Sequence, residues 1–182
     1  YCALSYVWGN ATQLVLTSQN VERLEAEISL YNSSSVPKTI LDAMDLCRRI
    51  EQPYLWADSL CILNDGDNQY RQINSMDAIY NRANLTIIAA SRCDANAGLA
   101  LIHMSRHVAM HSEKGGKIEA FSAPSPQIAS EAIARSRLAS RGWTLQEYCL
   151  SRRVVILTED FAFFRCHDAL RVETFGLPFF HP

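Results

Sequence analysis

The sequence predicts an α/β domain with a central, mainly parallel β-sheet. Short apolar segments rich in β-branched residues, such as Leu85–Ala90, have the length and character of strands buried on both faces. Longer segments between them, such as Lys38–Ile50, carry apolar residues at the helical period. The two kinds of segment alternate along the chain, which is typical of a parallel sheet covered by helices.

Length and composition indicate one globular domain. The chain has 182 residues, of which 48% are hydrophobic and 20% charged, so it can bury a sizeable core. A formal net charge of −2 gives no positive field for nucleic acid, and no apolar run approaches the roughly 20 residues of a membrane span. The chain opens on the apolar stretch Tyr1–Trp8 without a methionine, so we expect 1–182 to be a single domain from a longer protein.

In the N-terminal half, strands and helices are expected in turn. The expected strands are Tyr1–Trp8, Gln13–Thr17, Tyr54–Ile62 and Leu85–Ala90, and the expected helices are Lys38–Ile50, Tyr70–Ala83 and a segment within Asn20–Tyr31. Pro37 is placed to open the first long helix, and Pro53 to end it. Asn64–Asp67 is a turn cluster.

The C-terminal half contains an irregular insertion at about 100–130, since His111–Ser130 is rich in Gly, Pro and Ser. Helices are then expected at Ile128–Leu138 and from Arg141–Gly142 to Leu150, and strands at Arg153–Leu157 and Phe161–Cys166, joined by the turn Thr158–Asp160. We expect Val154–Leu157 to be a core strand and Phe161–Cys166 to pair with it or lie at the sheet edge.

The six cysteines and five histidines show no pattern of a metal site or a disulfide framework. Because no Cys-x-x-Cys pair occurs, we expect six reduced thiols in an intracellular protein. His103, His107 and His111 recur every four residues and would share one face of a helix. Gly115 and Gly116 follow them and no carboxylate cluster accompanies them, so we expect surface histidines and no metal site.

Common catalytic signatures are absent: the sequence has no P-loop, no Gly-x-Gly-x-x-Gly and no Gly-x-Ser-x-Gly. Asp58 interrupts the apolar run Tyr54–Ile62. Ligands of parallel α/β sheets gather outside the carboxyl ends of the strands, where such an aspartate would face them. The alternative is that Asp58 caps the following turn or pairs with an arginine in the core.

The stretch Arg141–Glu147 is the richest in chemistry. On a helix, Trp143 and Glu147 are i and i+4, so ring and carboxylate project from one face. A carboxylate beside an aromatic surface can bind a ribose diol and stabilise an oxocarbenium-like centre. The alternative is a core tryptophan with a solvated glutamate and Arg141 beside it.

Three blocks of the sequence together resemble the signature blocks of the fungal heterokaryon-incompatibility (HET) domain. They are Ala3–Gly9 (ALSYVWG), Tyr54–Ile62 (YLWADSLCI) and Arg141–Glu147 (RGWTLQE). Linking segments fit as well: Pro37–Ile40, Asp42–Ala43, Gln72–Met76, Ile79–Tyr80 and Leu85–Ala90. The chain departs from the family at Asn64, where the family usually has Gln, and at Gly98–Leu101, where it has Gly-Leu-Pro-Gly.

The resemblance implies a cytoplasmic effector domain that triggers programmed cell death when genetically unlike hyphae fuse. HET domains are also distantly similar to TIR domains, which implies a flavodoxin-like, three-layer fold. In this chain Leu4–Tyr6 with Gly9 resembles the first-strand motif of TIR domains, and Trp143–Glu147 resembles their Trp-Cys-Leu-x-Glu helix. The TIR helix glutamate cleaves nicotinamide from NAD.

By that analogy Glu147 would be catalytic and NAD would be a substrate, with no resident cofactor. The residues expected to bind substrate are Ser5, Tyr6, Trp8, Gly9, Asp58, Arg141 and Trp143. Expected partners are further copies of the chain and an upstream nonself-sensing protein or domain, with no nucleic acid and no membrane. The alternative function is a non-catalytic signalling module that oligomerises and recruits death partners.

Overall fold

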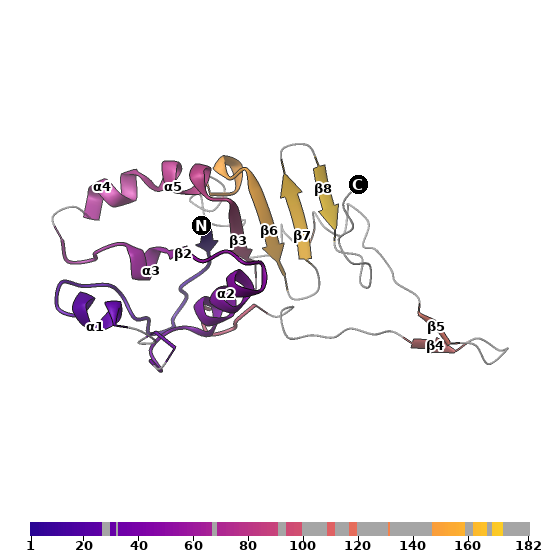
Figure 1. Ribbon diagram of the computed structural model, residues 1–182, viewed down its shortest axis with the longest axis horizontal. Coiled ribbons are helices and arrows are strands. Elements are labelled where there is room, and N and C mark those ends of the chain that lie inside the picture. The colour runs from indigo at the N-terminus through magenta and orange to yellow at the C-terminus, as the bar shows by residue number, and fades with distance from the viewer. Residues whose placement is uncertain are drawn as a thin grey trace.

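The computed structural model describes residues 1–26, 30–31, 33–66, 69–90, 94–99, 109–111, 117–119, 131, 147–158, 162–166 and 169–172. Their main feature is a six-stranded sheet in the order β2-β1-β3-β6-β7-β8 (Figure 1). The strands are β1 Cys2–Ser5, β2 Leu55–Ala57, β3 Leu85–Ala89, β6 Arg153–Leu157, β7 Ala162–Cys166 and β8 Ala169–Val172.

The sheet is parallel over its first four strands and antiparallel over its last two. Strand β1 pairs with β2 on one side and β3 on the other, and β3 pairs with β6, all in parallel. Strands β7 and β8 follow as antiparallel neighbours of β6. The predicted α/β class with a mainly parallel sheet is therefore confirmed, with β8 as an additional strand that the sequence did not indicate.

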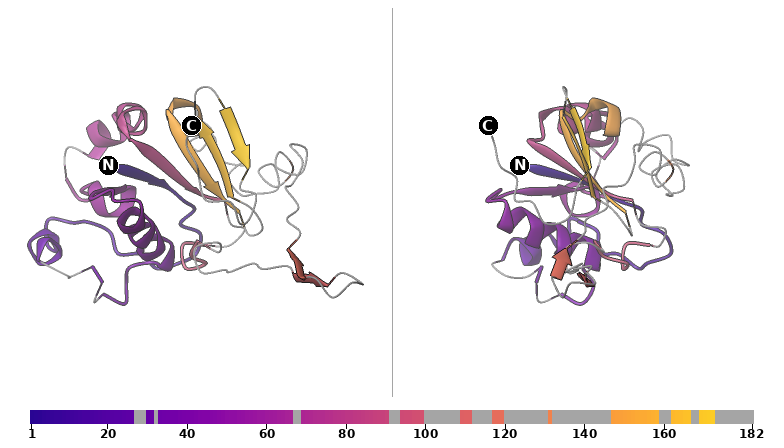
Figure 2. Two further views of the ribbon diagram at one scale, coloured as in Figure 1. Left: turned by 45° about the vertical axis from the view of Figure 1, so that its right-hand side comes forward. Right: turned by 90° about the vertical axis from the view of Figure 1, so that its right-hand side faces the viewer.

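Helices lie on both faces of the sheet (Figure 2). Their bounds are α1 Val21–Glu25, α2 Lys38–Arg49, α3 Asp58–Cys61, α4 Gln69–Asn74 and α5 Met76–Arg82. The connection from β1 to β2 carries α2, and that from β2 back past β1 to β3 carries α4 and α5. Because parallel crossovers are right-handed, connections that run in opposite directions across the sheet place their helices on opposite faces.

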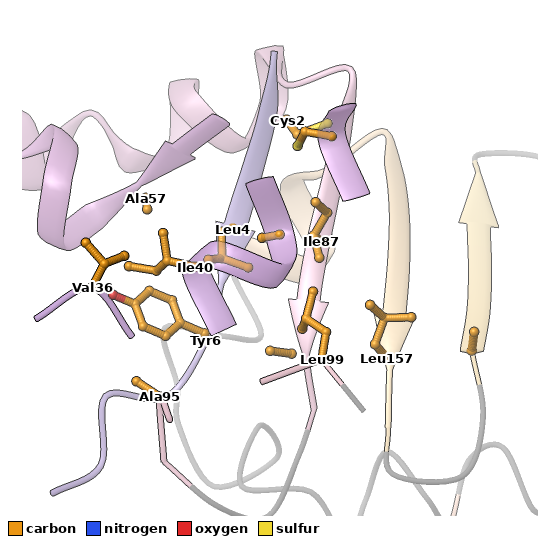
Figure 3. Close-up of a cluster of buried hydrophobic side chains, with 14 residues drawn as sticks. Cys2, Leu4, Tyr6, Val36, Ile40, Ala57, Ile87, Ala95, Leu99 and Leu157 are labelled. Carbon is orange, nitrogen blue, oxygen red and sulfur yellow. The ribbon is translucent and has the colours of Figure 1, made fainter. Parts of the chain in front are cut away.

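The period-two alternation of β1 divides the core between the two faces. Leu4 lies beside Ile40 of α2 in Figure 3 and Cys2 belongs to the same buried cluster, while Ala3 packs with Tyr80 of α5. This alternation fixes the position of Ser5, which follows Ala3 by two residues and so points to the α5 face of the sheet.

Helix α2 matches its prediction closely, because its apolar stripe Ile40, Ala43 and Cys47 is buried. It ends at Arg49, and Glu51 then adopts a left-handed backbone with φ 56°, so the chain leaves the helix before Pro53. The side chain of Ile50, predicted to belong to the stripe, is 39% exposed.

Three of the predicted strands are wrong in whole or in part. The run Tyr1–Trp8 is strand only at β1, Cys2–Ser5. Residues 11–17 form no strand: Leu14 N donates to Ser35 O and Leu16 N to Ser59 O, at 3.1 and 2.8 Å, in place of a strand ladder. The run Tyr54–Ile62 is strand only at β2, and from Asp58 it becomes the short helix α3. A short apolar run does not by its period distinguish strand from helix.

The predicted helix Tyr70–Ala83 is divided into α4 and α5 at Ser75. The Ser75 hydroxyl donates to Arg71 O at 2.9 Å, a local hydrogen bond that competes with helix continuation. Of its predicted apolar face, Tyr80 is fully buried and Met76 is half-buried.

The expected strands after the insertion form as β6 and β7, although β8 rather than β7 occupies the end of the strand order. Within the insertion, β4 Ala109–His111 and β5 Lys117–Glu119 make a two-stranded antiparallel sheet where a loop was predicted. Since His111 is in a strand, it does not share a helix face with His103 and His107, which are outside the described residues. The predicted helix 128–138 is also outside them apart from Glu131, which is helical.

Candidate functional site

The candidate site lies at the carboxyl edge of the parallel strands, where the strand order reverses. Ser5 is the last residue of β1, and Asp58 directly follows β2. Going from β1 to β2 and then back to β3 makes the β1/β3 position a switch point, and open α/β sheets bind ligands at such points. The edge therefore has both polar side chains and a favourable place in the topology.

Glu147 reaches this edge from the other end of the chain. It begins the described helical residues 147–150, which precede β6. The Ser5 hydroxyl donates to Glu147 Oε2, joining residues 142 positions apart. Ser5 is buried and Glu147 is half-buried, so the pair lies at the border between core and surface.

The backbone of Glu147 is anchored to the sheet through buried hydroxyl groups. The Ser151 hydroxyl donates to Glu147 O at 2.6 Å, and Ser151 Oγ lies 2.6 Å from Thr86 Oγ1 of β3. Both Ser151 and Thr86 are buried, so water does not compete for these bonds. The helical turn of Glu147 is thus held directly over β3.

Arg165 of β7 holds the carboxyl end of the same helical turn. Its Nη2 donates to Tyr148 O at 2.5 Å and to Ser151 O at 2.9 Å, and its guanidinium lies 4.2 Å from the Tyr148 ring centroid. The last carbonyls of a helix carry partial negative charge, so a guanidinium is well suited to this position.

A second carboxylate, Asp58, is bound by an indole. Trp8 Nε1 donates to Asp58 Oδ1 and Oδ2 at 3.2 and 3.1 Å, and Ser59 N donates to Asp58 Oδ1 at 2.7 Å. The hydrogen bonds between Trp8 and Asp58 thus join the segment after β1 to the segment after β2. Asp58 is the first residue of α3 and does not precede the helix as a cap, and the Trp8 side chain binds its carboxylate.

Two buried tyrosines lie next to these carboxylates. Tyr6 Oη is 2.9 Å from Ser59 Oγ and 2.7 Å from Gln13 Oε1, and burial, followed by the charge of Asp58, raises the pKa of Tyr6 well above its usual range. Burial also raises the pKa of Tyr80, and the charges of Glu147 and then Asp58 raise it further. Tyr80 therefore lies within electrostatic reach of both carboxylates.

Gly9 allows the chain after β1 to pass close to the loop after β3. Its φ is 63°, and a Cβ at this position would lie 2.4 Å from Asp94 Cβ. Ala95 N donates to Trp8 O at 3.3 Å across the same contact. A side chain at Gly9 would therefore be strained in its backbone and would collide with its neighbour.

The structure brings the predicted residues together in two pairs, Ser5 with Glu147 and Trp8 with Asp58. Tyr6 is 7% exposed and packs in the core on the α2 side of the sheet (Figure 3). The predicted site residues Arg141 and Trp143 are outside the described residues.

Sequence reasoning missed Tyr80 and Arg165. The position of Tyr80 on an apolar helix face predicted a core residue. Its hydroxyl could have indicated a further role, because a buried phenol requires a hydrogen-bond partner. Arg165 was a single charge within the apolar strand Phe161–Cys166, and a buried strand tolerates such a charge only where it has partners.

In the part of the chain that the structure describes, the cysteines, the possible metal ligands and the helices can also be compared with the predictions. Five cysteines there are free thiols, namely Cys2, Cys47, Cys61, Cys149 and Cys166. No three His, Cys, Asp or Glu side chains in that part are grouped as metal ligands would be. None of its helices combines the length and the apolar character needed to cross a bilayer.

Fold and site together define an α/β domain with one hydroxyl–carboxylate pair and one indole–carboxylate pair at the carboxyl edge of its parallel strands. The sequence model of the family described as "Heterokaryon incompatibility protein (HET)" matches residues 1–147. The chain therefore belongs to the HET family, as its three sequence blocks predicted.

A curated relative carries the same name. The chain is 33% identical over 94 residues to "Heterokaryon incompatibility protein 6, OR allele" of Neurospora crassa. That alignment covers 48% of this chain and 14% of the relative, so the chain corresponds to a small part of the longer protein. No solved structure matches the chain.

Proposed function

We propose that this chain is an intracellular effector domain of heterokaryon incompatibility that kills the cell by cleaving NAD. The observation that carries the proposal is the Ser5–Glu147 hydrogen bond at the carboxyl edge of the sheet. Glu147 is the residue that the TIR analogy selects, and it meets the end of β1, the strand whose motif supplies the other half of that analogy.

The strand order adds support. The parallel strands run β2-β1-β3-β6, which is the 2-1-3-4 order of flavodoxin-like sheets. In such sheets the crevice beside the first strand holds nucleotide ligands. If NAD bound there, the ribose that carries nicotinamide would lie next to the carboxylate of Glu147, which meets the end of β1.

The proposed reaction hydrolyses one glycosidic bond. The bond between ribose C1′ and the nicotinamide nitrogen breaks, and nicotinamide leaves with the bonding electron pair, so its ring becomes neutral. Water adds to C1′ and releases a proton, giving ADP-ribose. The Glu147 carboxylate stabilises the positive charge that develops on the ribose, and the Ser5 hydroxyl fixes the direction of that carboxylate.

Asp58 has a positioning role in this proposal. The hydrogen bonds from Trp8 fix its carboxylate, and we propose that the indole ring stacks on a base or a nicotinamide ring. The same bonds hold the chains after β1 and β2 together, so the edge is preorganised before substrate binds.

Glu147→Gln tests the proposal because it retains size and hydrogen bonding and removes the charge. We expect a melting temperature close to that of the wild type, together with loss of nicotinamide release in vitro and loss of toxicity on expression in a fungal host. Glu22→Gln is the matched control, since Glu22 is an exposed glutamate on α1, and we expect it to behave as wild type.

Full toxicity of a well-folded Glu147→Gln protein would overturn catalysis by this residue. The domain would then be the non-catalytic module that oligomerises and recruits death partners, with Glu147 as a structural residue. Toxicity without measurable NAD loss in the wild type would lead to the same conclusion.

A further inference from the structure

Asp42 is a buried carboxylate that joins helix α2 to the loop after β3. Its Oδ2 accepts hydrogen bonds from Lys38 Nζ at 2.6 Å, one turn earlier in the helix, and from Leu99 N at 2.8 Å, 57 residues away. Asp42 is 6% exposed, and a charge so far removed from water is tolerated only where polar partners hold it. The loop backbone supplies one of these partners, so the position of the loop and the burial of this charge depend on each other.

Gly98 lets the loop backbone reach this carboxylate. Its φ is 75°, and a Cβ at this position would lie 2.5 Å from Asp42 Oδ2 and 2.6 Å from Lys38 Nζ. A residue without a side chain fits against the ion pair, and glycine also adopts the left-handed backbone without strain. The loop is therefore shaped at this point for contact with Asp42 and Lys38.

The first turn of α2 holds the loop at a second point. Thr39 N donates to Ala95 O at 3.0 Å. Ala95 and Leu99 are each 1% exposed, and both lie in the core on the α2 side of the sheet (Figure 3). Because α2 follows β1 in a parallel crossover, its first turn lies at the carboxyl edge of the strands. The loop is thus fastened at the edge that carries the candidate site.

The loop after β3 also contacts the segment that carries Trp8. Ala95 N donates to Trp8 O at 3.3 Å, and the loop passes directly against Gly9. Trp8 in turn binds the Asp58 carboxylate through its indole N–H. Contacts therefore run from Asp42 through the loop to Trp8, and a shift of the loop would shift the residue proposed to stack on a substrate ring.

We propose that Asp42 is a positioning residue: its charge fastens the loop after β3 to α2, and the fastened loop holds Trp8 where a bound dinucleotide requires it. The part concerning substrate rests on the proposed function, since the β1/β3 switch point lies between this loop and the segment after β1. Asp42 is on the α2 side of the sheet, whereas Ser5, which binds Glu147, points to the α5 side. Asp42 therefore acts on binding and not on the chemical step.

Amide hydrogen exchange, followed by NMR, tests the fastening of the loop without any activity. In Asp42→Asn the acceptor of the Leu99 N–H becomes neutral, and hydrogen bonds to neutral acceptors are weaker than those to carboxylates. We expect the Leu99 amide to exchange about tenfold faster than in the wild type. The amide of Ala90, which donates to a carbonyl of β6 at 2.8 Å, is the internal reference, and we expect its exchange rate to be unchanged.

Asp45→Asn is the matched control for the loss of a charge from α2. Asp45 is on the same helix and forms salt bridges with Arg48 and Arg49 at 2.6 and 2.7 Å, so this variant also removes a carboxylate and its ion pairs. We expect the exchange rate of the Leu99 amide to be that of the wild type.

Gly98→Ala separates the loop from the same carboxylate by a different route, because its Cβ would collide with Asp42 Oδ2. We expect the Leu99 amide to exchange faster in this variant also, so the inference can be tested even if Asp42→Asn does not fold. An unchanged Leu99 rate in a folded variant would overturn the fastening. An equal acceleration at Ala90 would do the same, since the whole fold would then be loosened.

The part concerning substrate is tested by nicotinamide release at varied NAD concentration. We expect Asp42→Asn to raise KM about fivefold and to leave kcat within about twofold of the wild type, because a displaced loop weakens ground-state and transition-state binding alike. A variant that merely loses folded protein would show a lower kcat at unchanged KM. Asp45→Asn is again the control, and we expect both of its constants to be those of the wild type.

The outcomes separate the two proposals. A wild type that releases no nicotinamide contradicts the proposed function, and the exchange rates then still decide whether Asp42 fastens the loop. An active wild type whose KM is unchanged by Asp42→Asn overturns the positioning role, even if the Leu99 amide exchanges faster.

Discussion

Individual residues at the carboxyl edge connect segments that are far apart in the sequence. Ser5 meets Glu147, and Trp8 meets Asp58. Gly9 lets the segment after β1 approach the loop after β3. Each contact involves a residue type that the sequence motifs contain. The motifs therefore combine chemical groups with the backbone features that bring those groups together.

Gly9 provides a test at the residue scale. We expect Gly9→Ala to lower the free energy of unfolding by about 2–3 kcal/mol, because alanine would adopt a left-handed backbone and its Cβ would collide with Asp94. Gly66→Ala is the control, since its Cβ would meet only the end of the Leu63 side chain, at 2.8 Å. Urea unfolding measures both, and equal losses would contradict the argument.

Residue identities were predicted from the sequence better than residue partners. Asp58 was singled out because it interrupts an apolar run, Glu147 because it would share a helix face with Trp143, and Ser5 because it lies in the motif that resembles the first strand of TIR domains. The sequence did not indicate that the Asp58 carboxylate binds the Trp8 indole, or that the Tyr80 hydroxyl donates to Leu4 O. Such contacts depend on how strands pair, and no local pattern encodes that pairing.

At the scale of elements, the helical turn of Glu147 depends on its neighbours for its position. Its described residues, 147–150, are bonded to the sheet on more than one side. Thr86 of β3 and Arg165 of β7 reach it through Ser151 and through carbonyl oxygens. The sheet therefore determines the position of the proposed catalytic residue.

Arg165→Lys tests this dependence. Lysine retains the positive charge but not the planar fork of donors, so we expect a loss of about 2 kcal/mol in unfolding free energy and reduced activity. Arg153→Lys on β6 is the control, because Arg153 is exposed. An Arg165→Lys protein as stable and as active as the wild type would show that the fork is dispensable.

Elements with a strong period were predicted well, and short apolar runs were not. Helix α2 has a clear apolar stripe over 12 residues, so its period identifies it. The run Tyr54–Ile62 changes from strand to helix at Asp58, which accepts a hydrogen bond from Ser59 N in the new helix. Residues 11–17 resemble a strand in composition, but their backbone groups bond to loops.

At the scale of the whole molecule, the alternation of strands and helices predicted the mainly parallel sheet. The added strand β8 and the hairpin β4–β5 were not indicated, because both are short and depend on antiparallel neighbours. The proposed killing activity also belongs to this scale, since an effector that is silent until triggered needs a change in assembly. A formal charge of −2 opposes such self-association only weakly.

Forced self-association tests that proposal. We expect an inducibly dimerised form to arrest growth of the host cells, and the same form with Glu147→Gln to leave growth unchanged. Colony growth and cellular NAD, measured before and after adding the inducer, are the readouts. Growth that continues after dimerisation of the wild-type chain would contradict activation by self-association.

The distance of 142 residues between Ser5 and Glu147 also sets an order of events during translation. Strand β1 leaves the ribosome first, yet two of its partners and the glutamate that meets it are made later. At about 5–20 residues per second, roughly 7–28 seconds separate the synthesis of the two residues. A nascent chain therefore lacks the pair until the helical residues before β6 have emerged, so a domain proposed to kill its own cell cannot complete its site while only its first strands have been made.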